Sequence, residues 1–289
     1  MKKLLILHFS FFIFHSAFAA AFASAFAACG CGVAPEREND FWWENDKFGM
    51  RAYGPGEFHK WSGLDIFNKM PGAASVGDLL RKRLGPVGNW HTTVTHGLLD
   101  NYTVGAGRGC GAVALWGDGE WKTYPDWETS EILVNTPEKV EFKLVYPAFS
   151  AMGKMTYHIT LEQGKRFFKN EVTFEKNYRG GFAVGPGLDL EPARDHHGSV
   201  FEDKKLGIVS IFEDPKNDVE GSTATAIILD PKDAKDVEFM TDHMNCRVMT
   251  LKKNSFTYYA GCAWSKAGEI TTAEQWKDCV LTFRKEIEK

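Results

Sequence analysis

Residues 89–116 contain the densest group of side chains in the sequence that can do acid–base or anion-binding chemistry. His91, Tyr102 and Arg108 fall within it, and every second residue from 105 to 111 is glycine. Glycine tolerates positive φ and close backbone approach, so this glycine run predicts an irregular surface loop. An apolar run follows it and predicts a buried strand. A polar loop held by a core strand is a common setting for a binding or catalytic site.

These three side chains match the needs of β-elimination on an acidic sugar. Arginine offers a planar fork to a carboxylate, and Arg108 would neutralise the carboxylate of a uronate. His91 or Tyr102 would then remove the adjacent proton. The other of that pair, or His196, would protonate the departing oxygen. The alternative is a glycine-rich hairpin whose histidines are only solvated.

Further polar and aromatic residues are candidates for contact with the sugar. The sequence has nine tryptophans, and an aromatic ring can stack on the apolar face of a pyranose, although most tryptophans in any protein belong to the core. Adjacent histidines on a strand point to opposite faces, so only one of a pair can enter a given site. The candidate substrate-binding residues are Trp43, Asn45, Arg51, Tyr53, Trp90, Asp100, His197 and His243.

Neither a metal nor a cofactor is expected. The cysteines outside the N-terminal region are scattered and form no CxxC pair, so a structural zinc site is not indicated. No glycine-rich phosphate fingerprint follows a strand and opens a helix. Glycoside hydrolysis by paired carboxylates is also less favoured, because no two acids stand out on facing strands.

The first 28 residues predict a signal peptide, with two lysines, then an apolar run, then a tract of small residues. Ala27-Ala28-Cys29-Gly30 resembles a lipoprotein cleavage box, which would attach the protein to a membrane through lipidated Cys29. Phe26 stands where such a box usually has leucine, so simple release into the periplasm is the alternative. We therefore expect an exported protein, either periplasmic or an outer-membrane lipoprotein.

Charge points away from nucleic acid. Residues 1–28 contain two lysines and no acids, so their removal takes the formal net charge from −4 to −6. An acidic chain without basic runs does not have the electrostatics of a nucleic-acid-binding protein. The expected partner is an acidic oligosaccharide, and the sequence leaves the oligomeric state open.

The periodicity predicts an all-β protein, an antiparallel β-supersandwich closed by a C-terminal helix. Residues 41–53 predict a half-exposed strand. Thr271 or Thr272 can cap the helix, and its apolar residues recur at helical spacing from Trp276 to Ile287. We divide the chain into a signal peptide (1–28), a tether (29–35) and one sandwich domain (36–289). The strands predicted after residue 130 are Glu131–Asn135, Glu141–Phe149, Lys154–Leu161, Phe168–Lys176, Phe182–Leu190, Leu206–Phe212, Ala224–Leu229, Cys246–Leu251 and Ser255–Trp264.

Several motifs resemble those of one family. The run from Phe41 to Pro55 holds Trp-x-Glu-Asn-Asp and Arg-x-Tyr-Gly-Pro, and further matches lie at residues 63–69, 100–105, 109–111 and 258–266. Together they resemble the domain of unknown function 4861 family. The resemblance implies an exported sandwich of the galactose-mutarotase or polysaccharide-lyase type, associated with breakdown of uronate-containing polysaccharides. The expected activity is β-elimination, as a lyase or an oligosaccharide dehydratase. The alternatives are a non-catalytic carbohydrate-binding protein and a mutarotase- or epimerase-like enzyme.

Overall fold

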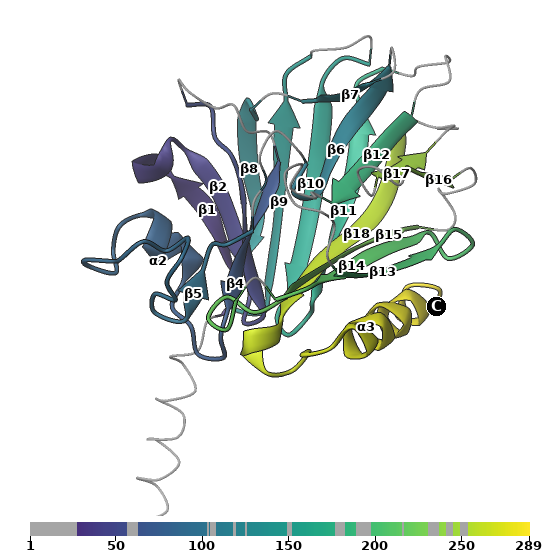
Figure 1. The fold of residues 1–289 in the computed structure, drawn as a ribbon. Coiled ribbons are helices and arrows are strands. Elements are labelled where there is room, and N and C mark those ends of the chain that lie inside the picture. Colours follow the sequence, from purple (N-terminus) through teal and green to yellow (C-terminus); the bar gives the residue numbers. More distant parts are fainter. Residues whose placement is uncertain are drawn as a thin grey trace, which may run out of the picture.

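The computed structural model describes residues 28–289 apart from 57–62, 103, 105–107, 118–119, 125, 149–151, 177–182, 189–197, 216, 231–236, 241–244 and 249–253. Its strands form three sheets of five, eight and five strands, and the strands pair antiparallel (Figure 1). The predicted antiparallel β-sandwich with a C-terminal helix is confirmed.

An eight-stranded sheet is the largest layer. Along β9 and β10 buried and half-buried residues alternate, because one face of the sheet looks into the core. In spatial order its strands are β13 (Gly198–Asp203), β14 (Ile208–Glu213), β15 (Thr223–Leu229), β18 (Ser255–Trp264), β11 (Phe167–Phe174), β10 (Met155–Glu162), β9 (Lys139–Tyr146) and β8 (Thr129–Asn135).

Two smaller sheets share the main hydrophobic core with this large sheet. The N-terminal sheet runs β1 (Gly30–Ala34), β2 (Asp40–Glu44), β3 (Phe48–Ala52), β4 (Leu64–Lys69) and β5 (Leu98–Leu99), with the 3-10 turn η1 (Pro35–Arg37) after β1. The other sheet runs β16 (Val237–Met240), β17 (Asn245–Val248), β12 (Ala183–Leu188), β6 (Cys110–Gly117) and β7 (Glu120–Thr123).

The C-terminal helix α3 (Ala273–Glu286) lies on the outer face of the large sheet (Figure 1). Thr272 caps it, and Gln275 completes a capping box, as the sequence predicted. Trp276 stacks on Phe167 with ring centroids 5.6 Å apart. Because α3 covers one face of β15 and the core covers the other, every residue of β15 is buried. The short 3-10 helix η2 (Ser265–Ala267) follows β18.

Two expectations about the N-terminal region need correction. Residues 30–34, placed in a tether, form β1 and pair with β2 along its whole length. Residues 41–53, predicted to be one half-exposed strand, contribute to the hairpin of β2 and β3, whose residues are all buried. The physical reason is that both faces of this sheet are covered. Its inner face meets the main core, and helix α2 (Val76–Leu80) packs on its outer face around Trp42.

Cys29 lies inside the fold at its N-terminal edge. Its side chain is buried, its sulfur lies 3.6 Å from Gln163 Oε1, and its backbone N–H donates to the Pro137 carbonyl. A lipid on this sulfur would have to draw it out of the core, and lipidation stays a prediction. Within the described residues, no helix has both the length and the apolar character needed to cross a membrane.

Candidate functional site

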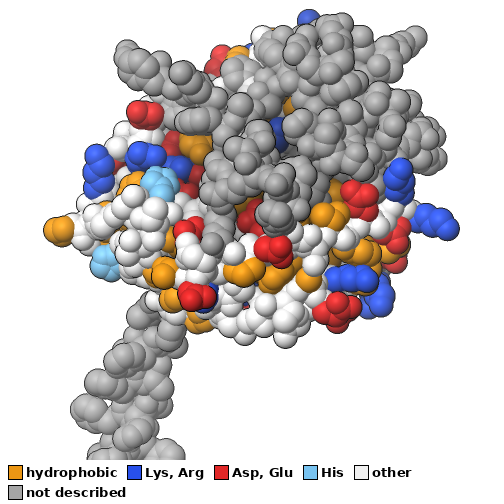
Figure 2. All heavy atoms as spheres, viewed as in Figure 1, with side chains coloured by type: hydrophobic (Ala, Val, Ile, Leu, Met, Phe, Trp, Pro, Cys, Tyr) orange, Lys and Arg blue, Asp and Glu red, His pale blue; other side chains and the backbone are white. Residues whose placement is uncertain are grey.

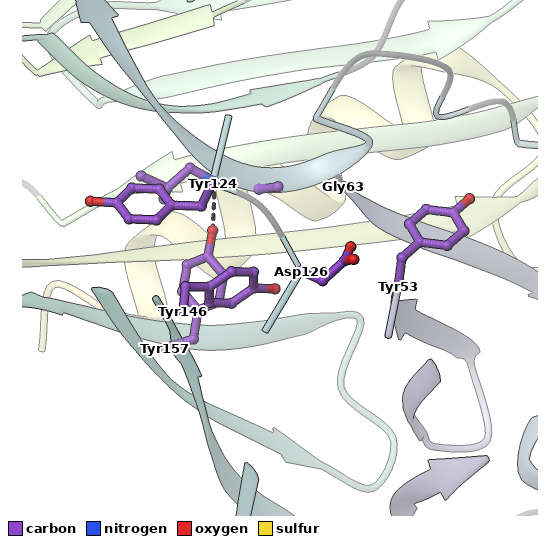
Figure 3. A pocket seen from close by; sticks show the side chains of 8 residues that line it. Tyr53, Gly63, Tyr124, Asp126, Tyr146 and Tyr157 are labelled. Carbon is purple, nitrogen blue, oxygen red and sulfur yellow. Dashed lines mark hydrogen bonds between the residues drawn. The ribbon is translucent and has the colours of Figure 1, made fainter. Parts of the chain in front are cut away.

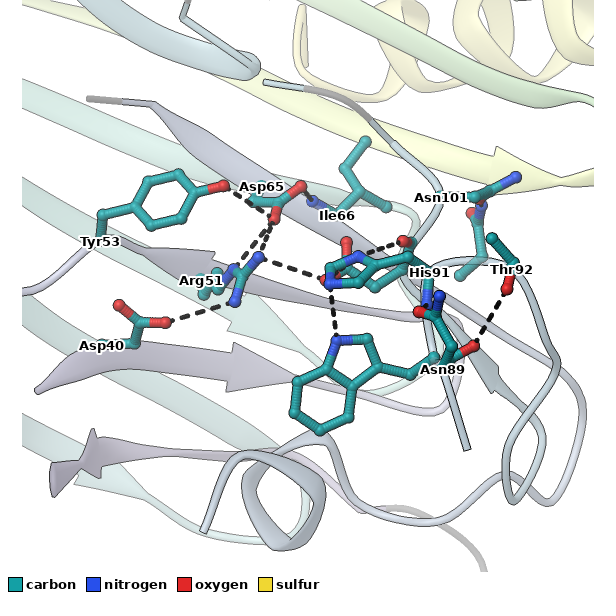
Figure 4. Close-up of polar contacts among 12 residues, drawn as sticks. Asp40, Arg51, Tyr53, Asp65, Ile66, Asn89, His91, Thr92 and Asn101 are labelled. Carbon is teal, nitrogen blue, oxygen red and sulfur yellow. Dashed lines mark hydrogen bonds and ion pairs between the residues drawn. The ribbon is translucent and has the colours of Figure 1, made fainter. Parts of the chain in front are cut away.

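Arg51 is the centre of a buried ion network. Its register on β3 sets it opposite Asp65 on β4, and its Nε and Nη2 donate to Asp65 Oδ2 at 2.9 and 2.7 Å. Nη1 lies 3.4 Å from Asp40 Oδ2, and Nη2 lies 3.2 Å from Asp100 Oδ2 (Figure 4). All four side chains are at most 4% exposed. The guanidinium is thus directed at protein carboxylates.

One cation faces three carboxylates here, and the protonation of the cluster follows from that imbalance. Burial and the neighbouring Asp65 raise the pKa of Asp100 well above its ordinary value, with Arg51 opposing the shift. Burial by itself lowers the pKa of Arg51, but Asp100 and Asp65 outweigh it and raise that pKa well above normal. Arg51 therefore stays charged, and Asp100 holds a proton more readily than an ordinary aspartate does.

His91 sits at the outer edge of this network. Its Nδ1 lies 3.0 Å from the backbone oxygen of Asp100 and 3.3 Å from Asp100 Oδ2, while its side chain is 53% exposed. The Trp90 indole donates to His91 Nε2 at 3.0 Å. Because an indole N–H can only donate, Nε2 must accept and the imidazole proton must be on Nδ1. Both ring nitrogens are therefore in use, and His91 can act as a base only after Trp90 moves away.

A groove opens beside Trp90 and His91. It has a volume of about 470 Å³, within the range typical of small-molecule sites. Arg37 lies over the Trp90 ring, 5.6 Å from its centroid. The lining residues are Leu79, Lys82, Leu84, Gly85, Val87, Gly88, Asn89, Trp90 and His91.

A second, smaller cavity is lined by four tyrosines (Figure 3). Its volume is about 10 Å³, room for roughly one water molecule. The Tyr157 hydroxyl accepts from the Val113 N–H at 2.7 Å, and the rings of Tyr146 and Tyr157 meet edge to face at 5.2 Å. The residues that line the cavity are Tyr53, Gly63, Ala112, Val113, Tyr124, Asp126, Tyr146 and Tyr157.

Charges around the cavity tune these hydroxyls. Burial raises the pKa of Tyr157, while the Val113 N–H and the positive charge of Arg108 act to lower it. Burial also raises the pKa of Tyr146 well above normal, and Tyr157 and Asp126 add to that shift. These tyrosines therefore keep their protons at neutral pH. Arg108 acts on the same cavity although it does not line it.

Tyr53 belongs to both groups of residues. It lines the tyrosine cavity, and its hydroxyl donates to Asp65 Oδ2 at 3.1 Å (Figures 3 and 4). Burial and Asp65 raise the pKa of Tyr53. A continuous set of polar contacts thus runs from the cavity through Asp65, Arg51 and Asp100 to the exposed His91.

Comparison with known proteins places the chain in a family. The model of the family described as "Domain of unknown function (DUF4861)" matches residues 22–289. The chain belongs to the DUF4861 family. A relative, "Uncharacterized protein P7" of Formosa agariphila, is 28% identical over 284 residues, which cover 90% of this chain and 68% of that protein.

Two solved structures resemble this DUF4861 protein weakly. A 4-alpha-glucanotransferase from Thermococcus litoralis matches 78% of this chain with a TM-score of 0.38, and the galactosidase domain of AgaSK, an alpha-galactosidase-sucrose kinase, matches 86% with a TM-score of 0.40. Identity is 10% in both, and the chain spans only 37% and 44% of their lengths. A TM-score below 0.5 does not define a common fold, so nothing about function is transferred from them.

The structure brings together five of the residues that the sequence singled out. Trp90, His91 and Asp100 meet at the groove, and Asp100 leads through Arg51 to Tyr53. Arg51, expected to contact substrate, is held by aspartates instead. Tyr102 and Arg108 are buried, 6% and 5% exposed, and Tyr102 belongs to the main core. His196, His197 and His243 lie outside the described residues.

Two other predicted substrate contacts are structural in this DUF4861 protein. Trp43 is fully buried and packs on Phe142 and Phe168, so it cannot meet a ligand. The amide of Asn45 donates to the Glu162 and Lys165 carbonyls, and its oxygen accepts from two backbone N–H groups of the β2–β3 turn. All of its hydrogen-bonding capacity is used to hold the hairpin on the large sheet.

The sequence also left important residues unnoticed. Asp40 precedes the apolar run 41–43 and Asp65 lies between Leu64 and Ile66, which is a signal, because a carboxylate placed among buried apolar residues needs a partner. Tyr146 and Tyr157 occupy inward positions of the alternating strands β9 and β10, and a buried tyrosine hydroxyl also needs a partner. In the described part of the chain, no three His, Cys, Asp or Glu side chains are grouped so as to hold a metal ion.

Proposed function

We propose that this protein acts on uronic-acid-containing oligosaccharides by β-elimination, as a lyase or an oligosaccharide dehydratase. The observation that supports this is the tyrosine cavity, whose lining includes four tyrosines and the carboxyl of Asp126, while Arg108 lies close enough to affect the pKa of Tyr157. Elimination beside a carboxylate needs a cation, a base and a proton donor, and all three residue types occur there.

In the proposed mechanism Arg108 neutralises the substrate carboxylate. Asp126 removes the proton from the carbon next to that carboxylate, and the C–H electron pair forms the new C=C bond. The bond from the neighbouring carbon to oxygen breaks, and Tyr157 or Tyr146 protonates the departing oxygen. Proton transfer from Asp126 to the tyrosinate, directly or through water, restores the resting state.

This assignment replaces His91 and Tyr102 as the acid–base pair. Both nitrogens of His91 are engaged, by Asp100 and Trp90, and Tyr102 is buried in the main core. The cavity itself has room for roughly one water molecule. It can therefore take the reacting atoms and not a whole pyranose, and we expect residues beyond its lining to hold the ring.

The test is incubation with a panel of uronate oligosaccharides while ultraviolet absorbance is followed for the new conjugated double bond. Mass spectrometry then separates loss of water (dehydratase) from loss of a sugar (lyase). Tyr157→Phe and Tyr146→Phe, made singly and together, should lower the rate by about 100- to 10,000-fold for the tyrosine that acts as the acid. Arg108→Lys keeps the charge but loses the planar fork, and should raise KM for the uronate.

Tyr259→Phe is a matched control, because Tyr259 lies on the other face of β18 and packs on Phe283 of α3. It should leave the rate unchanged. If no oligosaccharide in a broad panel gains unsaturation, the elimination proposal fails.

A non-catalytic carbohydrate-binding protein is the second candidate, and the groove beside Trp90 favours it. That function predicts saccharide affinity without turnover and little effect of Tyr157→Phe. A mutarotase- or epimerase-like enzyme would change the configuration of a sugar without producing unsaturation, which proton NMR of the same incubations would show. We expect the protein to be exported, as a periplasmic protein or an outer-membrane lipoprotein, and to meet its oligosaccharide there.

A further inference from the structure

We propose that the groove along residues 79–91, here called the Trp90 groove, is a second binding site that takes an anionic saccharide unit. It is separate from the tyrosine cavity, since the two share no lining residue. The inference rests on the saccharide class of the proposed function but does not depend on elimination. The Trp90 groove would hold the oligosaccharide at a point away from the bond that reacts.

The aromatic wall of the groove is held in one orientation. Trp90 packs partly buried against the α2 cluster, its indole N–H donates to His91 Nε2, and Arg37 covers its ring at 5.6 Å. His91 is fixed in turn by Asp100. A ring fixed before binding loses little conformational entropy when a sugar stacks on it, so more of the contact energy appears as affinity.

The charge of the groove favours an anion. None of the nine described residues that line it is acidic, although the chain as a whole has a net charge of −4. Lys82 is exposed, and no acid of the described chain pairs with it. Arg37, over the Trp90 ring, adds a second cation. Figure 2 shows Lys and Arg side chains gathered beside a histidine on the flank formed by the N-terminal strands and α2.

Local backbone structure positions Lys82 and Asn89 beside the groove. Lys82 has a φ of 56°, a left-handed conformation that is unfavourable for a non-glycine residue. It lies one residue beyond Arg81, the C-cap of α2, and its N–H donates to the Leu79 carbonyl. Asn89, which lines the groove, uses its side-chain oxygen for the His91 N–H, and its amide group donates to no described residue.

A neutral sugar would need the aromatic face alone, whereas a uronate also uses the cation. An exposed charge contact is worth little by itself, so the preference for the acid should be moderate and should fall as salt is added. This separates the anionic saccharide from a neutral one by measurement.

The experiment is calorimetric titration of the full-length mature protein with hexagalacturonate and with maltohexaose, at low and at 0.5 M salt. The Tyr157→Phe variant serves as the parent wherever the wild type turns the uronate over. We expect hexagalacturonate to bind at least 10-fold more tightly than maltohexaose at low salt. Trp90→Ala should weaken binding of hexagalacturonate at least 10-fold, and Trp90→Phe, which keeps a stacking ring, should weaken it less.

Lys82→Glu should reduce binding of hexagalacturonate and leave maltohexaose unaffected. Lys205→Glu, at an exposed turn between β13 and β14, is the matched charge control and should change neither. Circular dichroism checks that each variant is folded. If Trp90→Ala does not fold, Trp90→Phe still allows the test.

The proposal is overturned if hexagalacturonate binds equally well to the wild type and to the folded Trp90 and Lys82 variants, or if it does not bind at all. Absence of unsaturated product, with these affinities intact, would remove only the elimination proposal.

Discussion

The hydroxyl of Tyr53 lies 3.1 Å from Asp65 Oδ2, and this bond joins the buried ion network to the tyrosine cavity. The same carboxylate oxygen also accepts two bonds from Arg51. Asp65 therefore fixes both the guanidinium of Arg51 and the hydroxyl of Tyr53, a residue that lines the cavity. Replacing Arg51 should therefore disturb Tyr53, and replacing Tyr53 should disturb Arg51, because buried hydrogen-bonded groups have no water to replace a lost partner.

Replacing Arg51 should be severe. Arg51→Met leaves Asp40, Asp65 and Asp100 without their common cation, and breaking a buried pair in this way costs about 3–5 kcal/mol. Urea unfolding, monitored by tryptophan fluorescence, measures this loss of unfolding free energy. The matched control is Lys143→Met, which removes an exposed ion pair with Glu131 and should cost under about 1 kcal/mol. Equal losses in the two variants would mean that the network does not stabilise the fold.

Asp100 should make stability depend on pH in a defined direction. Its pKa is raised in the folded state, above the unfolded value of about 3.9, so the folded protein binds this proton more tightly than the unfolded chain. The contribution of Asp100 to stability is therefore largest below the unfolded pKa and declines as pH rises through the folded pKa.

Asp100→Asn cannot ionise, so the stability of the wild type relative to this variant should fall as pH rises from about 4. Urea unfolding at a series of pH values gives this difference. Glu131→Gln, at an exposed position, serves as the control and should track the wild type. If the wild type instead became more stable relative to Asp100→Asn as pH rose, Asp100 would be a stabilising ionised carboxylate, and the prediction would be wrong.

Gly109 and Gly85 give a matched pair of glycine replacements. Both have left-handed backbone, with φ of 61° and 73°, so alanine costs about 1–2 kcal/mol at either place. A Cβ on Gly109 would also lie 2.1 Å from the Leu64 carbonyl oxygen, whereas one on Gly85 meets nothing within 4 Å. Gly109→Ala should therefore lower the free energy of unfolding by roughly twice as much as Gly85→Ala, or more. Thermal unfolding of the two variants compares them, and similar losses would contradict the clash.

Cys29 should resist alkylation while the protein is folded. Burial, helped by Asp46 and Glu44, raises the pKa of its thiol to about 12, and only the thiolate reacts quickly. Peptide mass spectrometry after iodoacetamide at pH 8 should find Cys29 unmodified in the folded protein and modified in urea. Rapid modification of the folded protein would mean that β1 opens. The same peptide from the native host tests lipidation through its mass.

Much of the fold was determined by local sequence. Alternating apolar residues predicted the strands of the large sheet because one of its faces is buried, and Thr272 with Gln275 predicted the start of α3 because a capping box needs only four residues. The family motifs, which are local in the same way, led to the DUF4861 family.

Tertiary structure alone decided which of these residues meet. Trp43 and Trp90 both stand beside polar residues in the sequence, yet Trp43 is fully buried and Trp90 lines a groove, because only packing determines which faces are covered. Arg51 finds Asp65 through strand register and Asp100 through a loop nearly fifty residues away. The tyrosine cavity joins residues of β6, β9 and β10 with Tyr53 and Gly63 beside the N-terminal sheet, and no local pattern encodes that convergence, since it depends on how the sheets pack.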